Sequence, residues 1–242
     1  MTAWAFPGRP ALVLAGVFFL LACLVRAPVS VFGFLLPPGV ELRNVEGSIW
    51  NGKAAAVGFR GMLVQEQAEW HFQPRALLAA RLAWAVSGRF EGRESRLNLV
   101  LRPGGGELDE VIVFLPLEPL AALHPRLKGV QAGAVLQASA EILRPGAPVR
   151  ATVSVERLFS RLVPQADLGS FRLDIETDAG GKGNWRIMPV AGSLDISGGG
   201  QLDTARSTVS GQVMLTPRGP MPGLTPALSA LPKVGAGYQL TF

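Results

Sequence analysis

Side chains that commonly perform catalysis or bind metals are few in this chain and stand far apart. It has one cysteine, Cys23, and two histidines, His71 and His124. A structural zinc site is filled by four such ligands, so we expect no metal site. The serine-hydrolase sequence Gly-x-Ser-x-Gly and the phosphate-binding sequence Gly-x-x-x-x-Gly-Lys-Ser/Thr do not occur. The sequence therefore predicts a non-enzymatic protein with no catalytic residue, metal or cofactor.

Three carboxylates, Glu107, Asp109 and Glu110, cluster directly after the turn sequence Pro103-Gly-Gly-Gly. A pair of carboxylates suffices for glycoside hydrolysis, which makes the cluster a candidate for catalysis. The cluster follows an arginine-rich run, however, and a turn of this composition joins two strands. We therefore expect these side chains to close a hairpin and not to catalyse a reaction.

Beyond residue 52, short runs alternate apolar with polar residues, which is the period of a strand with one buried and one solvated face. The clearest run is Phe171, Leu173 and Ile175, which alternate with charged residues. Closely spaced glycine- and proline-rich turns separate the runs, so neighbouring strands must pair antiparallel. Residues 74–80 and 117–124 are instead rich in helix formers beside proline, and we expect short helices there that cover an edge or end of the sheet.

An apolar segment near the N-terminus predicts a membrane anchor. Residues 11–25 carry no charge, and apolar residues up to 36 extend the run toward the length that a bilayer core of about 30 Å requires. The large apolar side chains of the anchor are Leu12, Leu14, Val17, Phe18, Phe19, Leu20, Leu21 and Leu24. Arg9 precedes the run, so the positive-inside rule places residues 1–10 in the cytoplasm and residues 37–242 in the periplasm. We predict a single-pass protein of the cell inner membrane.

Two alternatives to an uncleaved anchor remain open. Leu20-Leu-Ala-Cys23 resembles a bacterial lipobox, in which Cys23 would carry a lipid. A cleaved signal peptide is the other alternative, although bulky and charged residues stand where small cleavage-site residues are usual. In every case the exported domain must fold without an internal disulfide, because the chain has one cysteine.

The predicted fold class is mainly β: an N-terminal transmembrane helix, then a single curved or rolled antiparallel β-sheet domain with one or two short helices. The chain has a net charge of +5, and six arginines lie between residues 75 and 102. We expect these arginines to lie on a solvated strand face, with anionic lipid headgroups or an acidic partner as the alternative. We expect no nucleic-acid partner, because an exported domain meets no chromosome and no RNA-binding signature appears.

Two specific phrases follow the anchor. The first runs Leu36-Pro-Pro-Gly-Val-Glu-Leu42 and then Val45-x-Gly-Ser-Ile-Trp-Asn-Gly52, and the second runs Trp70-x-x-x-Pro-x-x-Leu-Leu-x-x-Arg-Leu82. Both resemble the type II secretion system protein N family, although Ser48-Ile49 stands where Thr-Leu is usual. The residues that carry the resemblance are Pro37, Gly39, Val40, Gly47, Trp50, Gly52, Trp70, Pro74 and Leu77.

The resemblance implies an accessory component of the machine that exports folded proteins through an outer-membrane secretin. Its partners would be the secretin, the inner-membrane platform or both. Two interpretations of the motif residues remain open: they start the first hairpin, or they form a docking surface for another secretion component. The family's β architecture also resembles that of AsmA-type lipid-associated proteins, so phospholipid binding or transfer is the alternative function. A lipid groove requires an apolar sheet face that stays uncovered, whereas an ordinary domain buries that face.

Overall fold

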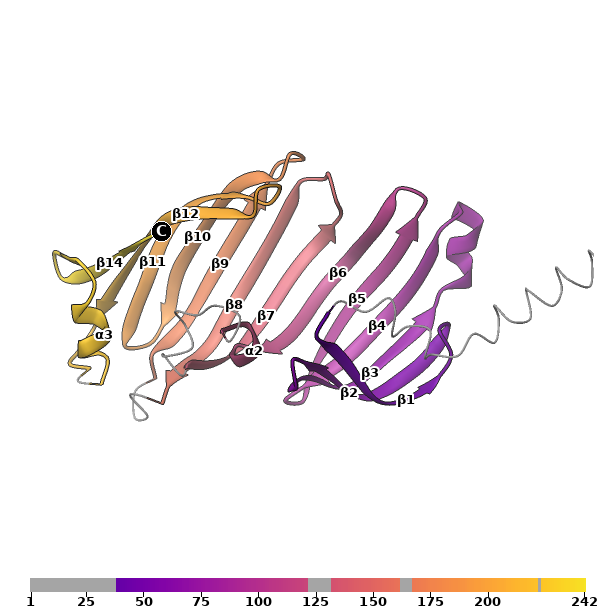
Figure 1. The fold of residues 1–242 in the computed structure, drawn as a ribbon, viewed down its shortest axis with the longest axis horizontal. Coiled ribbons are helices and arrows are strands. Elements are labelled where there is room, and N and C mark those ends of the chain that lie inside the picture. Colours follow the sequence, from indigo (N-terminus) through magenta and orange to yellow (C-terminus); the bar gives the residue numbers. More distant parts are fainter. Residues whose placement is uncertain (1–37, 122–131, 162–166, 222) are drawn as a thin grey trace, which may run out of the picture.

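A single antiparallel sheet makes up nearly all of the described structure (Figure 1). The computed structural model describes residues 38–121, 132–161, 167–221 and 223–242. The predicted anchor and its two alternatives lie outside these residues. Across the described ranges, no helix has both the length and the apolar character needed to cross a membrane.

The described part contains fourteen strands, and their spatial order follows the sequence from β1 to β12 and then continues with β14 and β13. Every pairing is antiparallel, as the closely spaced turns predict. The strands are β1 Val40–Gly47, β2 Asn51–Phe59, β3 Met62–Phe72, β4 Leu82–Phe90, β5 Arg93–Arg102, β6 Gly105–Pro116, β7 Ala132–Leu143, β8 Val149–Ser160, β9 Gly169–Thr177, β10 Lys182–Ala191, β11 Leu194–Asp203, β12 Thr208–Pro217, β13 Lys233–Val234 and β14 Gly237–Thr241.

Three short helices interrupt the meander within the described residues, one more than the sequence predicts. They are the 3-10 helix η2 at Pro74–Ala79 and the α-helices α2 at Glu118–Ala121 and α3 at Thr225–Ser229. The first two lie in the predicted segments 74–80 and 117–124, and the remainder of the second segment is outside the described residues. The third helix was not predicted. It is about one turn long and lies in a proline-rich stretch, so it is too short for the periodic spacing of apolar residues that indicates a helix.

The two faces of the sheet differ in chemistry. One apolar row runs in register across neighbouring strands: Ala138, Val153, Leu173, Ile187, Gly198 and Val213. The row one residue away points to the other face and is polar: Ser139, Thr152, Asp174, Arg186, Gly199 and Gln212. This is the two-residue period that the sequence predicts, carried across six strands.

The sheet curls over its apolar face near the N-terminal end. The Gln65 side-chain amide on β3 donates a hydrogen bond to the Phe114 carbonyl on β6, across the two intervening strands. Gly88 on β4 makes room, since a Cβ there would lie 2.7 Å from the Gln65 Oε1 atom. The prediction of a curved sheet therefore holds for this region.

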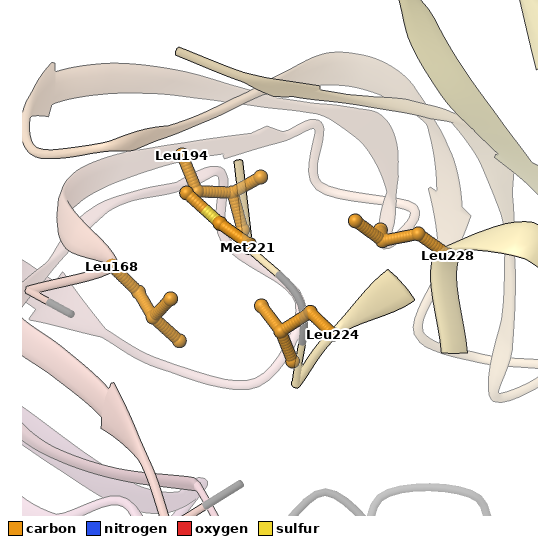
Figure 2. Packing of buried hydrophobic residues seen from close by; sticks show 5 residues of the cluster. All are labelled: Leu168, Leu194, Met221, Leu224 and Leu228. Carbon is orange, nitrogen blue, oxygen red and sulfur yellow. The ribbon is translucent and has the colours of Figure 1, made fainter. Parts of the chain in front are cut away.

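Two buried apolar clusters lie toward opposite ends of the strand order. We call the first the tryptophan cluster; its buried members are Ala54, Ala68, Trp70 and Trp84, on β2 to β4. We call the second the leucine cluster; its members Leu168, Leu194, Met221, Leu224 and Leu228 converge where the segment carrying α3 folds onto the ends of the strands (Figure 2).

Candidate functional site

The first motif phrase builds the turn between β1 and β2. The Ser48 hydroxyl oxygen accepts hydrogen bonds from the backbone N–H groups of Trp50 and Asn51, each at 3.2 Å. The Ser48 N–H in turn donates to the Asn51 carbonyl at 2.8 Å. A serine at this position therefore organises the turn with its own side chain, and threonine has the same hydroxyl for the purpose.

Two indoles from neighbouring strands hold this turn against the sheet. The Trp70 Nε1–H donates to the Ser48 carbonyl and the Trp84 Nε1–H donates to the Ile49 carbonyl, both at 3.0 Å. Both tryptophans are buried, so each indole satisfies its one polar group with a turn carbonyl that would otherwise lack a strand partner.

Trp50, at the tip of the turn, completes an aromatic group. Its ring stacks on Trp84 with centroids 6.2 Å apart, and it meets Phe72 edge-on at 4.7 Å. The Phe72 N–H also donates to the Trp50 carbonyl at 2.7 Å. The tryptophan cluster is therefore a rigid base formed by the turn and by strands β3 and β4.

At motif positions 47 and 52, the surrounding atoms leave no space for any side chain, so glycine is required. Gly47 has a φ of +96°, and a Cβ there would lie 2.4 Å from the Asn51 carbonyl oxygen. A Cβ on Gly52 would lie 2.4 Å from the Trp70 ring atom Cζ2. Neither distance is tolerated by real Cβ atoms, so only glycine allows the turn to close beneath the indole.

The remaining motif residues do not join this cluster as buried members. Gly39 is exposed, has a φ of +90°, and its carbonyl accepts the Arg60 N–H at 2.7 Å, which ties the start of β1 to the β2–β3 turn. Val40 is half-buried on β1, while Pro74 and Leu77 are exposed on η2. Pro37 lies outside the described residues. The structure thus brings Gly47, Trp50, Gly52 and Trp70 together at the turn, while Gly39, Val40, Pro74 and Leu77 take no part in its contacts.

Phe72 and Trp84 were missed as motif residues by sequence reasoning. Trp84 belongs to the alternating run Leu82-Ala-Trp-Ala-Val86, which indicates a buried strand face but no particular contact. Its register opposite Phe72 brings it to Trp50. The sequence signal that could have pointed to Trp84 is the concentration of aromatic residues soon after the first phrase. Trp84 donates its hydrogen bond to the carbonyl of Ile49, which lies 35 residues earlier in the chain.

The carboxylate cluster lies on the β5–β6 hairpin, as the sequence predicts. Arg102 Nη2 lies 2.6 Å from Glu107 Oε1 and Arg144 Nη1 lies 3.7 Å from Glu107 Oε2, and Glu107 is buried. Burial and, next, the hydrogen bond and negative charge of Glu107 raise the pKa of Asp109. In the described ranges, no three histidine, cysteine, aspartate or glutamate side chains are placed to hold a metal ion. The arrangement is an ion-paired hairpin end.

Comparison with known proteins gives one result. The family described as "Type II secretion system (T2SS), protein N" matches residues 38–241, which is nearly the whole described structure and includes both motif phrases from Pro38 onward. Searches of the curated proteins and of the solved structures found no significant match. The match covers far more than half of the chain, so this protein belongs to the type II secretion system protein N family.

Proposed function

We propose that this protein is a non-enzymatic assembly component that links the inner-membrane platform of the type II secretion system to the outer-membrane secretin. Family membership makes it a type II secretion component and implies association with the cell envelope. The family match over residues 38–241 is the observation that carries the proposal. Its mechanism is positional: the protein holds partners at a fixed separation.

The architecture suits a spacer. Residue 38 leads into the start of β1, beside the β2–β3 turn, so a membrane anchor in the preceding residues would lie at this end of the strands. The strands are mostly 9 to 12 residues long, which at about 3.3 Å per residue is about 30–40 Å. The opposite ends of the strands, where the tryptophan cluster and η2 lie, would then point away from the inner membrane.

A sheet edge offers one means of contact with a partner. Strand β1 is the first in the spatial order and pairs on one side with β2. A partner strand can add to such an edge through backbone hydrogen bonds. The charged residues Glu41, Arg43 and Glu46 on β1 limit which sequences do so, because each must find a compatible neighbour.

Phospholipid binding is the second candidate, and the apolar row on the middle strands favours it. Val153, Leu173 and Ile187 of this row are only half-buried and belong to neither apolar cluster. The described helices pack elsewhere: η2 against β4, α2 against β7, and α3 in the leucine cluster. The described helices therefore leave this apolar row uncovered, which meets the criterion for a lipid-binding face.

The chemistry of that face selects among ligands. Its backbone groups are paired within the sheet, so an extended peptide laid across it would bury its own amide groups without partners. An acyl chain has no such groups and gains about 0.8 kcal/mol for each buried CH₂. Acyl chains therefore suit this face better than peptide strands do.

One experiment addresses both candidates. The tagged full chain, expressed at its native level, is purified in mild detergent; bound proteins are identified by mass spectrometry and bound lipids are extracted from the same sample. Recovery of the secretin or platform proteins supports the assembly function. Stoichiometric phospholipid without any secretion protein overturns it in favour of lipid binding.

A matched pair of variants separates a specific lipid site from detergent-like adhesion. Leu173→Asn places a polar group in the apolar row and should reduce bound phospholipid at least several-fold. Arg186→Gln changes a neighbouring position on the polar face and should leave it unchanged. Equal lipid content in the two variants would exclude the apolar row as the binding surface.

A further inference from the structure

We propose that η2 is a docking element that inserts Leu77 and Leu78 into an apolar socket with an acidic rim on another type II secretion component. This inference rests on the proposed assembly function and names the surface that would perform it. In Figure 1, η2 is the violet helical turn between β3 and β4, at the right-hand end of the sheet.

The two leucines project from η2 with much of their surface exposed. Leu77 is 53% exposed and Leu78 is 93% exposed, and no residue of η2 is buried. A single exposed leucine needs no explanation, but two adjacent ones on one turn form a projecting apolar tip. Such a tip costs solubility and is retained most simply if a partner covers it.

The fold does not require this helix. Strands β3 and β4 are antiparallel neighbours, and the β5–β6 connection at the same end of the sheet uses only residues 103 and 104. The connection between β3 and β4 uses residues 73–81 for the same purpose. The additional residues therefore form a projection that a simple hairpin would lack.

The projection is held rigidly. The Ala80 N–H donates to the Leu77 carbonyl at 3.0 Å and the Arg81 N–H donates to the Ala76 carbonyl at 3.1 Å, which closes the helix. The Gln73 N–H donates to the Ala83 carbonyl at 2.8 Å, one residue from the tryptophan cluster. A pre-formed tip loses little conformational entropy on binding, which favours its use as an anchor in a pocket.

Charge indicates the character of the socket. Arg75 and Arg81 stand on either side of the leucines, and neither forms an ion pair with any described residue. Two carboxylates at this end of nearby strands are engaged by other cations, Glu46 by Lys53 at 3.1 Å and Glu107 by Arg102 at 2.6 Å. Two unpaired guanidinium groups around an apolar tip are complementary to acidic side chains around an apolar pocket.

A protein socket fits better than a membrane surface. An anionic surface contributes about 1 kcal/mol for each arginine, and two leucines add too little for stable attachment by themselves. In addition, residue 38 joins the sheet at the other end of the strands, so an inner-membrane anchor would hold η2 away from that bilayer. We therefore assign the tip to a protein partner.

Site-specific photo-crosslinking in the full chain tests this assignment in cells. A photoreactive amino acid replaces Leu78, and a matched control replaces Val209, which is 57% exposed at the same end of the strands but on β12. We expect a crosslink from position 78, and not from 209, to the secretin or to a platform protein. Crosslinks from position 78 only to lipid, only to a second copy of this chain, or to nothing would overturn the proposal.

Two sets of variants connect the contact with assembly. Leu77→Ser with Leu78→Ser, and Arg75→Glu with Arg81→Glu, should each reduce co-purification of the secretion partner at least tenfold. The thermal midpoint should not change, because these side chains are exposed, and Val209→Ser serves as the control. If wild-type protein recovers secretion components and both double variants do so equally, η2 is not the docking element although the assembly function stands. If wild-type protein recovers none, both proposals fail together.

Discussion

The two apolar clusters use different physical means to stabilise the sheet. The tryptophan cluster joins strands to the turn at residues 48–50 through indole hydrogen bonds, stacked rings and two glycines that have no room for a Cβ. The leucine cluster joins the segment carrying α3 to the strands through aliphatic contacts (Figure 2). The stability of the tryptophan cluster depends on the direction of its hydrogen bonds as well as on the apolar area that it buries. The stability of the leucine cluster depends on buried apolar area alone.

This difference determines how each cluster tolerates substitution. A contact that stabilises only through buried apolar area accepts another apolar side chain of similar volume, and the substitution lowers the free energy of unfolding by less than about 1.5 kcal/mol. A contact made by a directed N–H leaves a half-buried turn carbonyl without its hydrogen bond when the donor is removed, which costs about 1–3 kcal/mol. The tryptophan cluster should therefore be specific for residue type and the leucine cluster permissive.

Trp70→Ala should have the largest effect, lowering the free energy of unfolding by about 3–5 kcal/mol, because it removes a buried indole beneath the turn. Trp70→Phe keeps most of the apolar volume but loses the donor to the Ser48 carbonyl, and should still cost about 1–3 kcal/mol. Urea unfolding of the detergent-solubilised full chain, followed by far-UV circular dichroism, measures both. A phenylalanine variant as stable as wild type would show that area alone matters here.

Leu224→Ala should cost about 2–4 kcal/mol, because Leu224 is buried against the other members of the leucine cluster. Leu224→Met preserves volume without needing a directed contact, and should cost less than about 1.5 kcal/mol. The same urea titration gives the comparison. The proposed contrast between the clusters is wrong if the methionine variant loses as much stability as Trp70→Phe.

Gly47→Ala should cost about 2–3 kcal/mol, because the backbone is left-handed and the new Cβ meets the Asn51 carbonyl oxygen. Gly61→Ala is the matched control: its φ is +80°, yet nothing lies within 4 Å of a Cβ there. The control should lose only the cost of the left-handed conformation, about 1 kcal/mol. Equal thermal shifts for the two variants would show that space beside the turn is not limiting.

The same contrast explains which parts of the structure the sequence predicts. Alternation at Phe171, Leu173 and Ile175 predicts a strand, and β9 is one, because the two-residue period is local. The glycines at 47 and 52 indicate a close approach, since a residue type can reveal a steric need. That Trp84 bonds to the Ile49 carbonyl depends on the register of β3 against β4, which no local pattern contains.

The leucine cluster was less predictable for a related reason. Leu168, Leu194 and Leu228 come from segments far apart in sequence, and only the completed meander brings them together. Leu77 was predicted as part of the motif, but its exposure was not, because a leucine beside helix formers predicts a buried face as readily as an exposed tip. Sequence therefore predicts elements and steric constraints better than it predicts which of their faces are covered.

A buried charge between the clusters gives the smallest expected effect and involves neither of their packing modes. Glu107 is buried beside Asp109, and burial, followed by the hydrogen bond and the negative charge of Glu107, raises the pKa of Asp109. The folded state therefore binds this proton more tightly than the unfolded chain does. The resulting stabilisation is complete below the unfolded pKa, near pH 4, and is lost as the pH rises through the folded value.

Asp109→Asn removes this loss, so it should raise the thermal midpoint by about 1–2 °C at pH 7 and leave it unchanged below about pH 4. Thermal scans at the two pH values measure the difference, and an equal gain at both would mean that the substitution acts through packing, as in the leucine cluster, and not through the proton.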